Sequence, residues 1–483
     1  MRTTTFITAA VGILSTCTDA IQLQKRTDGP ARVVGLDVVR KQVENPLARD
    51  KLRKLRRRSK TVTATLDNEE TLYFANGTLG TPAQSLRLHI DTGSSDLWVN
   101  TASSTLCSKK TNPCQLAGTY TANSSSTYAY VASDFNISYV DGSGASGDYV
   151  TDTFTIGSTT LDKLQFGIGY TSSSPEGILG IGYEINEVQV GRAGKKAYNN
   201  LPAQMVADGL INSNAFSLWL NDLDASTGSI LFGGVDTAQY HGQLETLPVE
   251  KESGYYAEFL ITLTEIMLGD TVIAQDQALA VLLDSGSSLT YLPDAMAEAI
   301  YEQVDAQYDA SEGAAYVPCS LASNTSALNF TFTSPTIQVT MDELVIPVTS
   351  TTGQQLQFTD GTAACLFGIA PAGDSTSVLG DTFIRSAYIV YDLDNNEISL
   401  AQTNFNATST SVVEITTGTT AVPDATLVAN AATASSGSSG GEISGSVTLS
   451  SGSKSKNAGA MQTPPPPLAY GMAALGAGLY YAM

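Results

Sequence analysis

Short apolar runs broken by turn residues dominate the middle of the chain. From Val62 to about Phe405, stretches rich in Val, Ile, Thr and Tyr alternate with Gly, Asn, Asp and Ser, which is typical of many short β-strands. Apolar residues at helical spacing are few, and the clearest expected helix is Asp294–Val304. The pattern predicts an all-β fold for this part of the chain.

The first 58 residues fall outside the strand pattern and form two segments. Residues 1–20 carry Arg2 and an apolar run from Phe6 to Leu14, which predicts a secretory signal peptide. That run is too short to span a bilayer. Residues 21–58 form a basic arm, with 12 Lys and Arg against four acidic residues.

We interpret the basic arm as a propeptide. Lys25-Arg26 and Arg56-Arg57-Arg58 are sites at which a processing protease of the secretory pathway would cut. A plain solvated charge run is the alternative. Because the arm ends where a strand-rich region begins, in a chain with a secretory leader, processing is favoured.

The remainder of the chain is strongly acidic. From residue 59 onward there are 12 basic and 42 acidic residues. Nucleic acid is therefore excluded as a partner, because phosphate binding requires Lys and Arg. An acidic working pH is indicated, because protonated carboxylates would relieve the self-repulsion of the body.

After Asn404 the composition changes to Ser, Thr, Ala and Gly. Residues 406–457 are expected to form an extended stalk, since such a composition does not bury a core. The last 16 residues, Leu468–Met483, are uncharged and apolar or small. A transmembrane helix would require about 20 apolar residues.

The tail fits the signal for a glycosylphosphatidylinositol (GPI) anchor. Asn457-Ala458-Gly459 supplies small residues, and a spacer runs through Pro467 before the apolar end. We predict attachment at Asn457 and removal of residues 458–483. Localisation would then be the secretory pathway and the outer face of the cell membrane, with transfer to the cell wall left open. A soluble secreted protein is the alternative.

An internal duplication gives the strongest indication of function. The two copies are Leu88-His89-Ile90-Asp91-Thr92-Gly93-Ser94-Ser95 and Val281-Leu282-Leu283-Asp284-Ser285-Gly286-Ser287-Ser288. Two apolar residues and a glycine follow the aspartates by 87 and 94 residues, in Ile178-Leu179-Gly180 and Val378-Leu379-Gly380. One Asp-Thr-Gly is an ordinary turn, but two copies with matched partners are specific.

Paired aspartates suit peptide hydrolysis without a cofactor. A base must activate water and an acid must protonate the leaving nitrogen. Two close carboxylates do not both ionise, so they share a proton and divide these roles. We therefore expect Asp91 and Asp284 to be the catalytic pair. Catalytic support is expected from Thr92, Gly93, Ser94, Ser285, Gly286 and Ser287, with Ser94 and Ser287 orienting the carboxylates through their hydroxyls.

The chain resembles the pepsin family over about residues 70–405, and more closely the fungal candidapepsins and yapsins. The motifs that carry the resemblance are Asp91–Val99, Gly177–Tyr183, Leu231–Asp236, Leu379–Arg385 and Ala387–Asp392. The resemblance implies two similar all-β lobes, here 59–250 and 251–405, with a cleft between them and one catalytic aspartate from each lobe.

The family's flap maps to Tyr139-Val140-Asp141-Gly142-Ser143. By resemblance, Tyr139 closes over the substrate and Trp98 hydrogen-bonds its hydroxyl; substrate contacts are also expected from Asp141, Gly142 and Ser143. The residues themselves agree, because a Gly-rich hairpin tip suits a lid that excludes water.

Two departures from the family concern the second motif and the first cysteine loop. Ser285 and Ser287 stand where many relatives have Thr, but serine keeps each hydroxyl, so activity is expected to survive. The loop from Cys107 to Cys114 is short, so cleavage into two subunits there is not expected.

His89 shares a strand face with Asp91, two residues on. It is therefore expected either to lie beside the substrate in the cleft floor or to be a hydrogen-bonded, partly buried histidine. The two alternatives carry equal weight.

Cysteines and sequons complete the candidate sites. Cys17 lies in the leader, and the short-range pairing of the other four gives Cys107–Cys114 and Cys319–Cys365, with two further pairings possible on counting alone. No metal is expected, because there is no Cys-x-x-Cys and the only histidines are His89 and His241. Candidate N-glycosylation sites are Asn76, Asn123, Asn136, Asn324, Asn329 and Asn406.

The expected protein is a monomeric, surface-anchored aspartic endopeptidase that cleaves polypeptides best at acidic pH. The basic arm is expected to inhibit it by covering the cleft. The alternative is a wall-anchored binding protein that keeps this fold without chemistry. Because both aspartates, both motif glycines and Tyr139 are intact, the enzyme is favoured.

Overall fold

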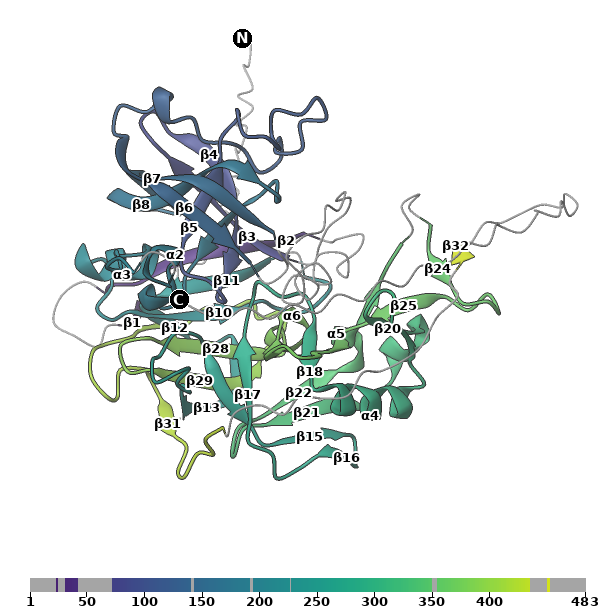
Figure 1. Cartoon of the computed structure of the whole chain (residues 1–483). Helices are drawn as coiled ribbons and strands as arrows, with labels where there is room; N and C mark the ends of the chain where they lie inside the picture. The colour runs from purple at the N-terminus through teal and green to yellow at the C-terminus, as the bar shows by residue number, and fades with distance from the viewer. Residues whose placement is uncertain are drawn as a thin grey trace, which may run out of the picture.

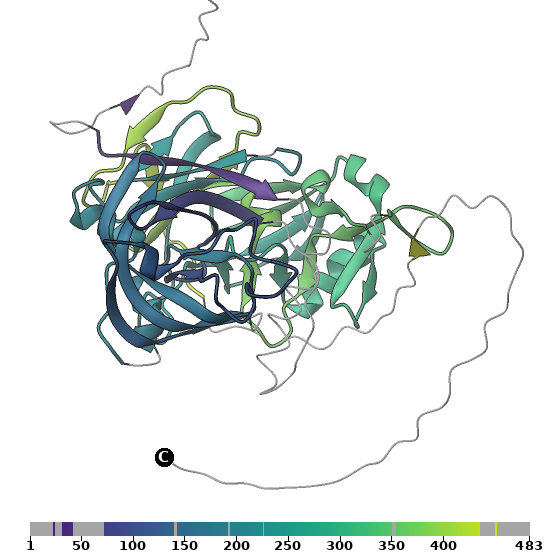
Figure 2. The ribbon, with the colours of Figure 1, turned by 90° about the horizontal axis from the view of Figure 1, so that it is seen from above.

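The computed structural model describes residues 23–24, 31–41, 72–139, 143–191, 194–225, 227–349, 354–434 and 450–451. Strands predominate, as the sequence predicts, and they form two lobes. In Figure 1 the upper lobe holds β4, β7 and β8, the lower lobe holds β17, β21 and α4, and β10, β11 and β28 lie between them. Figure 2 shows the same two lobes side by side, viewed from above.

A 14-stranded sheet runs from the upper lobe into the base of the molecule. Its strands, in spatial order, are β31 (Ala425–Leu427), β13 (Tyr240–Pro248), β29 (Glu397–Thr403), β28 (Ala387–Asp392), β10 (Ala215–Trp219), β11 (Thr227–Phe232), β2 (Val34–Lys41), β3 (Leu72–Leu79), β4 (Gln84–Asp91), β9 (Gly177–Gly180), β5 (Leu97–Asn100), β8 (Thr159–Ser172), β7 (Gly144–Ile156) and β6 (Ala129–Ser138).

The remaining sheets are smaller, and three of them build the second lobe. The five-stranded sheet contains β14 (Leu260–Leu263), β17 (Leu279–Leu283), β27 (Ser377–Leu379), β18 (Thr290–Leu292) and β26 (Ile369–Pro371). The two four-stranded sheets contain β16 (Thr271–Ala274), β15 (Glu265–Leu268), β21 (Ala327–Thr331) and β22 (Thr336–Thr340), and β19 (Gln307–Asp309), β20 (Ala314–Pro318), β25 (Ala364–Phe367) and β23 (Val345–Pro347). The others contain β1 (Leu23–Gln24), β30 (Val412–Glu414) and β12 (Gly234–Asp236), and β24 (Leu356–Gln357) with β32 (Ser450–Ser451).

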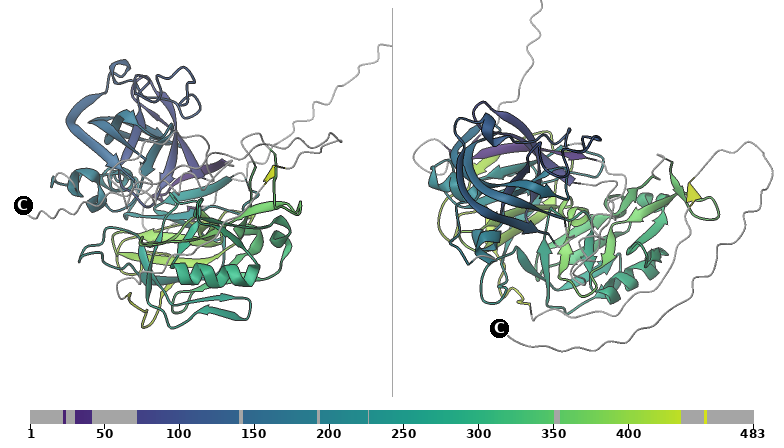
Figure 3. Two further views of the ribbon diagram at one scale, coloured as in Figure 1. Left: turned by 45° about the vertical axis from the view of Figure 1, so that its right-hand side comes forward. Right: turned by 45° about the horizontal axis from the view of Figure 1, so that its top comes forward.

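The described helices are short. They are α2 (Val188–Gly191), α3 (Leu201–Ala207), α4 (Asp294–Val304), α5 (Met341–Leu344) and α6 (Asp381–Ile384), with 3₁₀ turns at η1 (Ala122–Ser124), η2 (Glu184–Asn186) and η3 (Cys319–Ser323). The prediction of α4 is confirmed with its bounds. Its buried face includes Ala297, Ile300 and Tyr301, at the spacing of one helical face, and it lies at the periphery of the lower lobe (Figure 3).

Part of the basic arm belongs to the central sheet. Strand β2 pairs antiparallel with β11 on one side and β3 on the other. Its alternating residues Val34, Leu36 and Val38 are buried, as the two-residue period of a strand requires. The alternative of a solvated charge run is therefore wrong for residues 34–41, and the central sheet takes one strand from the predicted propeptide.

The expected start of the stalk is also corrected. Residues 406–434 pack on the body instead of extending from it: β30 pairs with β12 and β1, and β31 pairs with β13. The side chains of Val412 and Ile415 are buried, and so is Glu414. Within the described residues, no helix is long and apolar enough to cross a membrane. Most of the remaining stalk, and the tail, lie outside the described residues.

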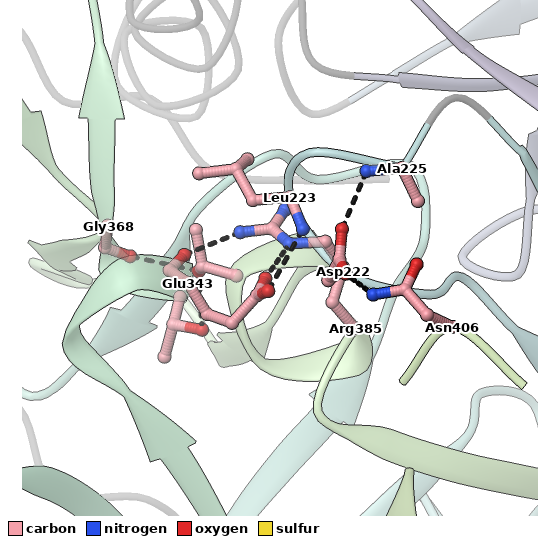
Figure 4. A network of polar contacts seen from close by, with 9 residues as sticks. Asp222, Leu223, Ala225, Glu343, Gly368, Arg385 and Asn406 are labelled. Carbon is pink, nitrogen blue, oxygen red and sulfur yellow. Dashed lines mark hydrogen bonds and ion pairs between the residues drawn. The ribbon is translucent and has the colours of Figure 1, made fainter. Parts of the chain in front are cut away.

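A buried ion pair joins elements from both halves of the chain (Figure 4). Glu343 of α5 pairs with Arg385, which follows α6, and both side chains are almost fully buried. The other carboxylate oxygen of Glu343 accepts a 2.9 Å hydrogen bond from Leu223 N, in the loop between β10 and β11. Asn406 donates to Asp222 in the same loop. Removing either partner would leave the other as an unpaired buried charge, which is costly. The network therefore holds α6 and the preceding β27 against the loop between β10 and β11, in the first half of the chain.

Candidate active site

The duplicated motifs form the same strand arrangement in each lobe. β4 pairs in parallel with β9, which carries the first apolar-apolar-glycine motif, and Asp91 is opposite Gly180. β17 pairs in parallel with β27, with Leu283 opposite Leu379. Asp284 N then donates to Leu379 O at 3.1 Å. The repeat in the sequence is therefore a repeat in the structure.

Asp91 is held by its own turn. Gly93 N donates to Asp91 Oδ1 at 2.9 Å, and Ser94 Oγ donates to Asp91 Oδ2 at 2.6 Å. The carboxylate is 2% exposed. The hydroxyl of Ser94 thus orients one oxygen, as predicted.

Asp284 has equivalent partners in the second lobe. Gly286 N donates to Asp284 Oδ1 at 2.8 Å, and Ser287 Oγ donates to Asp284 Oδ2 at 2.8 Å. The serine that replaces the usual threonine supplies the expected hydroxyl.

The motif glycines allow each carboxylate to lie against the opposite loop. A Cβ atom on Gly93 would lie 2.6 Å from Asp284 Oδ1, and one on Gly286 would clash with Asp91 Oδ1. Any side chain at these positions would push the loops apart. The absence of a Cβ therefore brings the two aspartates together.

A reciprocal set of hydrogen bonds fixes the spacing of the two loops. Thr92 Oγ1 donates to Leu283 O at 2.9 Å and accepts from Ser285 N at 2.9 Å. In return, Ser285 Oγ donates to Ile90 O at 3.0 Å and accepts from Thr92 N at 3.2 Å. We call these four bonds the Thr92–Ser285 grip. All of them are buried, so water does not compete for them.

This arrangement is suited to general acid–base chemistry on a water molecule. Two carboxylates that face each other share one proton, because both cannot be ionised at short range. The ionised member can accept a proton from water, while the protonated member can donate one to the leaving nitrogen. The near-symmetric hydrogen bonding gives the two aspartates equivalent support for these roles.

The flap hairpin forms as predicted up to its tip. β6 and β7 pair with Ser138 opposite Gly144, and Tyr139 N donates to Ser143 O at 2.9 Å. The expected hydrogen bond from Trp98 Nε1 to Tyr139 Oη is present at 2.7 Å. Burial, above all, and the nearby Asp91 raise the pKa of Tyr139 well above its usual value, so its phenol stays neutral. Asp141 and Gly142 lie outside the described residues.

His89 is a buried residue of the catalytic strand β4. Its side chain is 1% exposed, and its ring lies 5.6 Å from that of Phe74. These contacts fit the buried alternative, and a role beside the substrate stays a prediction that they do not test.

Both expected disulfides are present, Cys107–Cys114 and Cys319–Cys365. Five sequon asparagines are exposed, namely Asn76, Asn123, Asn136, Asn324 and Asn406, whereas Asn329 is half-buried. The five exposed asparagines are accessible to a glycosylating enzyme, and glycosylation stays a prediction.

One cluster near the site escaped the sequence analysis. Asp96 is fully buried and accepts hydrogen bonds from two tyrosines, Tyr149 and Tyr198. These partners lie 53 and 102 residues further along the chain. The available signal was a charged residue inside an otherwise apolar motif, Asp96-Leu97-Trp98-Val99.

Comparisons with known proteins agree with the site. Residues 72–403 match the family model described as eukaryotic aspartyl protease. The chain is 58% identical to the "Probable aspartic-type endopeptidase opsB" of Aspergillus oryzae over 86% of this chain and 85% of that protein. It is 52% identical to the protein of the same description from Arthroderma benhamiae, over the whole of both chains.

More distant similarities extend to other fungal proteases. Candidapepsin-3 of Candida albicans is 38% identical over 72% of this chain and 84% of that protein. The crystal structure of the aspartic proteinase from Irpex lacteus superposes with a TM-score of 0.59 at 22% identity, covering 78% of this chain and 99% of that one. With the paired aspartates in the expected geometry, the chain belongs to the pepsin family of eukaryotic aspartyl proteases.

Proposed function

We propose that this aspartic-type endopeptidase is a secreted, cell-surface enzyme that hydrolyses polypeptides best at acidic pH. The observation that carries the proposal is the mirrored pair Asp91 and Asp284, each held by its glycine and serine and joined by the Thr92–Ser285 grip. A silent binding protein with the same fold would have no need of this complete set of catalytic contacts.

Buried carboxyl groups support an acidic working range. Burial raises the pKa of Asp236, Asp392 and Glu397, and it raises the pKa of Glu187 to about 9. A carboxyl whose pKa is higher in the folded state binds more protons there than when unfolded. For Glu187 this stabilisation of the folded state is complete below pH 4.5, the pKa of the group in the unfolded chain. It is lost as the pH rises toward about 9, the pKa of the group in the folded protein. At Asp152 hydrogen bonds outweigh burial and lower the pKa, which has the opposite effect.

The basic arm is proposed to inhibit the enzyme before processing. Its strand β2 lies in the central sheet, and burial, together with the nearby Arg385, lowers the pKa of the Arg40 guanidinium. Arg40 is thus half-buried beside another cation, with Asp381 and Glu343 as the opposing charges. A fall in pH would reduce the negative charge of the acidic body as a whole, and so weaken its attraction for the basic arm.

Processing and pH should therefore act together. The unprocessed protein should be less active near neutrality than the form that starts near Ser59, and the two should approach each other as the pH falls. The measurement is cleavage of an internally quenched peptide by both forms between pH 3 and pH 8. Equal activity of the two forms across this range contradicts the inhibitory role, and a processed form most active at neutral pH contradicts the acidic assignment.

Attachment to the membrane is the remaining part of the proposal. It is supported by the leader, by the small triplet Asn457-Ala458-Gly459 and by the apolar tail. Residues 435–457, of which Ser450 and Ser451 pair with β24 of the body, would then link the body to the lipid.

The mature chain should accordingly end at Asn457 and carry a lipid. A phosphatidylinositol-specific phospholipase should release it from membranes, and mass spectrometry should find no peptide from residues 458–483. The control is a chain truncated after Ala434, which should be secreted without lipid. Recovery of an intact peptide ending at Met483 from the mature protein contradicts the anchor and leaves the protease assignment untouched.

A further inference from the structure

A second buried carboxylate ends the catalytic loop. Asp96 follows Asp91 by five residues, is fully buried, and comes immediately before β5. Its Oδ1 accepts hydrogen bonds from Tyr149 Oη at 2.8 Å and from Tyr198 Oη at 2.9 Å. Its Oδ2 accepts from Val188 N at 2.9 Å. Three donors on one buried carboxylate make it a strong anchor point.

The donors come from segments that surround the catalytic loop. Tyr149 lies on β7, the strand that leaves the flap tip, and its ring packs edge-on against Phe135 of β6, with centroids 5.2 Å apart. Asp96 therefore contacts one flap strand directly and the other through Phe135.

Tyr198 and Val188 belong to the segment that follows the first apolar-apolar-glycine motif. The ring of Tyr198 packs edge-on against that of Tyr149 at 5.9 Å. Tyr198 N donates to Glu187 Oε2 at 2.9 Å, so both ends of the segment from Glu187 to Tyr198 are gathered at Asp96.

The flap is thus attached to the catalytic loop at two levels. Near its tip, Trp98 Nε1 donates to Tyr139 Oη. At its base, Tyr149 donates to Asp96. Asp96 and Trp98 are two residues apart in the chain, so a single short stretch controls both attachments. Two points of attachment define an orientation, which one point does not.

Glu187 explains how a second carboxyl is tolerated beside Asp96. Burial, with smaller contributions from Asp96 and Glu184, raises the pKa of Glu187 to about 9. Glu187 is therefore largely neutral at neutral pH and below, so it adds little repulsion to a charge on Asp96. Burial raises the pKa of Asp96 itself, while its three hydrogen-bond donors lower it. The groups facing Asp96 are then three hydrogen-bond donors and one neutral acid.

We propose that Asp96 is a positioning residue for peptide hydrolysis: through Tyr149, Tyr198 and Val188 it fixes the base of the flap, and the contacts of Val188 and Tyr198 after β9, relative to Asp91. The inference rests on the endopeptidase activity of the dyad. A flap displaced at its base would contact the substrate less closely and bind it more weakly. The dyad itself is held by the Thr92–Ser285 grip, which does not include Asp96.

The test uses Tyr149→Phe and Tyr198→Phe in the processed protein, because each removes one hydroxyl and keeps the ring. With a quenched peptide that the wild type cleaves, each variant should raise KM about three- to tenfold with kcat within about twofold, the scale of partly losing one charge-assisted hydrogen bond. When Tyr149→Phe is added to Asp96→Asn, it should raise KM less than it does in the wild-type protein, because the two residues act through one contact.

Tyr120→Phe is the matched control. Tyr120 is also buried in the first lobe and donates to a carboxylate, Asp152 Oδ2, at 2.5 Å. Asp152 lies on β7, further from the flap tip than Tyr149, and Tyr120 N donates to Asn100 O of β5. The pair thus joins β7 to β5 without taking part in the Asp96 contacts. Tyr120→Phe should lower thermal stability and leave KM unchanged. Unchanged KM in both Tyr149→Phe and Tyr198→Phe, or an equal rise in Tyr120→Phe, overturns the inference. Because the wild type must cleave the peptide for the comparison to be made, these outcomes leave the endopeptidase assignment standing.

Discussion

Replacing Asp91 or Asp284 by asparagine should lower the rate of peptide hydrolysis by at least about 10³-fold, which lies within the range of about 10²–10⁴ for the loss of a general acid or base. Asparagine matches aspartate in size, so the Thr92–Ser285 grip should persist and the fold should be retained. It does not share the proton, however, so the pair can no longer supply both an acid and a base. The measurement is kcat/KM on a quenched peptide, with circular dichroism to verify folding.

A control substitution separates loss of chemistry from loss of structure. Asp236 is a buried aspartate whose Oδ1 accepts from Ala238 N at 3.0 Å and from Ser411 N at 2.7 Å, away from the dyad contacts. Asp236→Asn should lower the melting temperature and keep kcat/KM within a few-fold. If either dyad variant retained wild-type hydrolysis, the assignment of a shared-proton pair would be wrong.

Truncation after Asn404 should prevent folding or lower stability by several kcal/mol, whereas truncation after Ala434 should leave stability and activity near wild type. The shorter chain loses β30 and the buried side chains of Val412 and Ile415, each worth about 1.5–3 kcal/mol. It also loses Glu414, which accepts from Arg32 N and Asn212 Nδ2, both at 2.7 Å. The measurement is the thermal unfolding of the two truncated proteins after secretion, compared with that of the full chain.

A point substitution tests the same contact if the shorter chain is not secreted. Ile415→Ala keeps the chain length and should cost about 2–5 kcal/mol, the usual range for a large-to-small change in a core. Equal stability of the two truncated chains, together with a neutral Ile415→Ala, would show that residues 406–434 are dispensable.

The sequence predicted the parts of the site that are repeated within it. Each aspartate, its glycine and its serine lie within four residues of one another, so their mutual contacts follow from the local turn. The partner motifs with Leu179-Gly180 and Leu379-Gly380 were recognised by their similar spacing, and the structure adds that each forms the parallel strand beside its aspartate. The α4 helix was equally readable, because its apolar spacing is local.

The two terminal segments were harder to interpret, because their composition hides short strands. In Val34–Lys41, buried positions alternate with Gly35 and Asp37, but the many cations around them led to the interpretation as a basic propeptide, with no strand predicted in it. Val412–Glu414 is flanked by Ser and Thr, which indicated a stalk. Such strands are stabilised by pairing with partners far away in the chain, which no local pattern reveals.

The same reason explains why the role of Asp96 was not predicted. Its partners Tyr149 and Tyr198 lie on other segments, and nothing in their neighbourhoods marks them as its donors. Only the three-dimensional structure brings the end of the catalytic loop, β7 and the segment before α3 to one buried point.

The measurement that tests the central account most directly is active-site titration of the processed protein with a peptide that carries a hydroxyl at the position of the attacked carbonyl. Such a group mimics the tetrahedral intermediate between the two carboxylates. We expect complete inhibition at one equivalent per chain, with binding lost in Asp91→Asn and in Asp284→Asn. Full activity at saturating inhibitor, with loss of activity to a metal chelator or to a serine- or cysteine-directed reagent instead, would contradict catalysis by the aspartate pair.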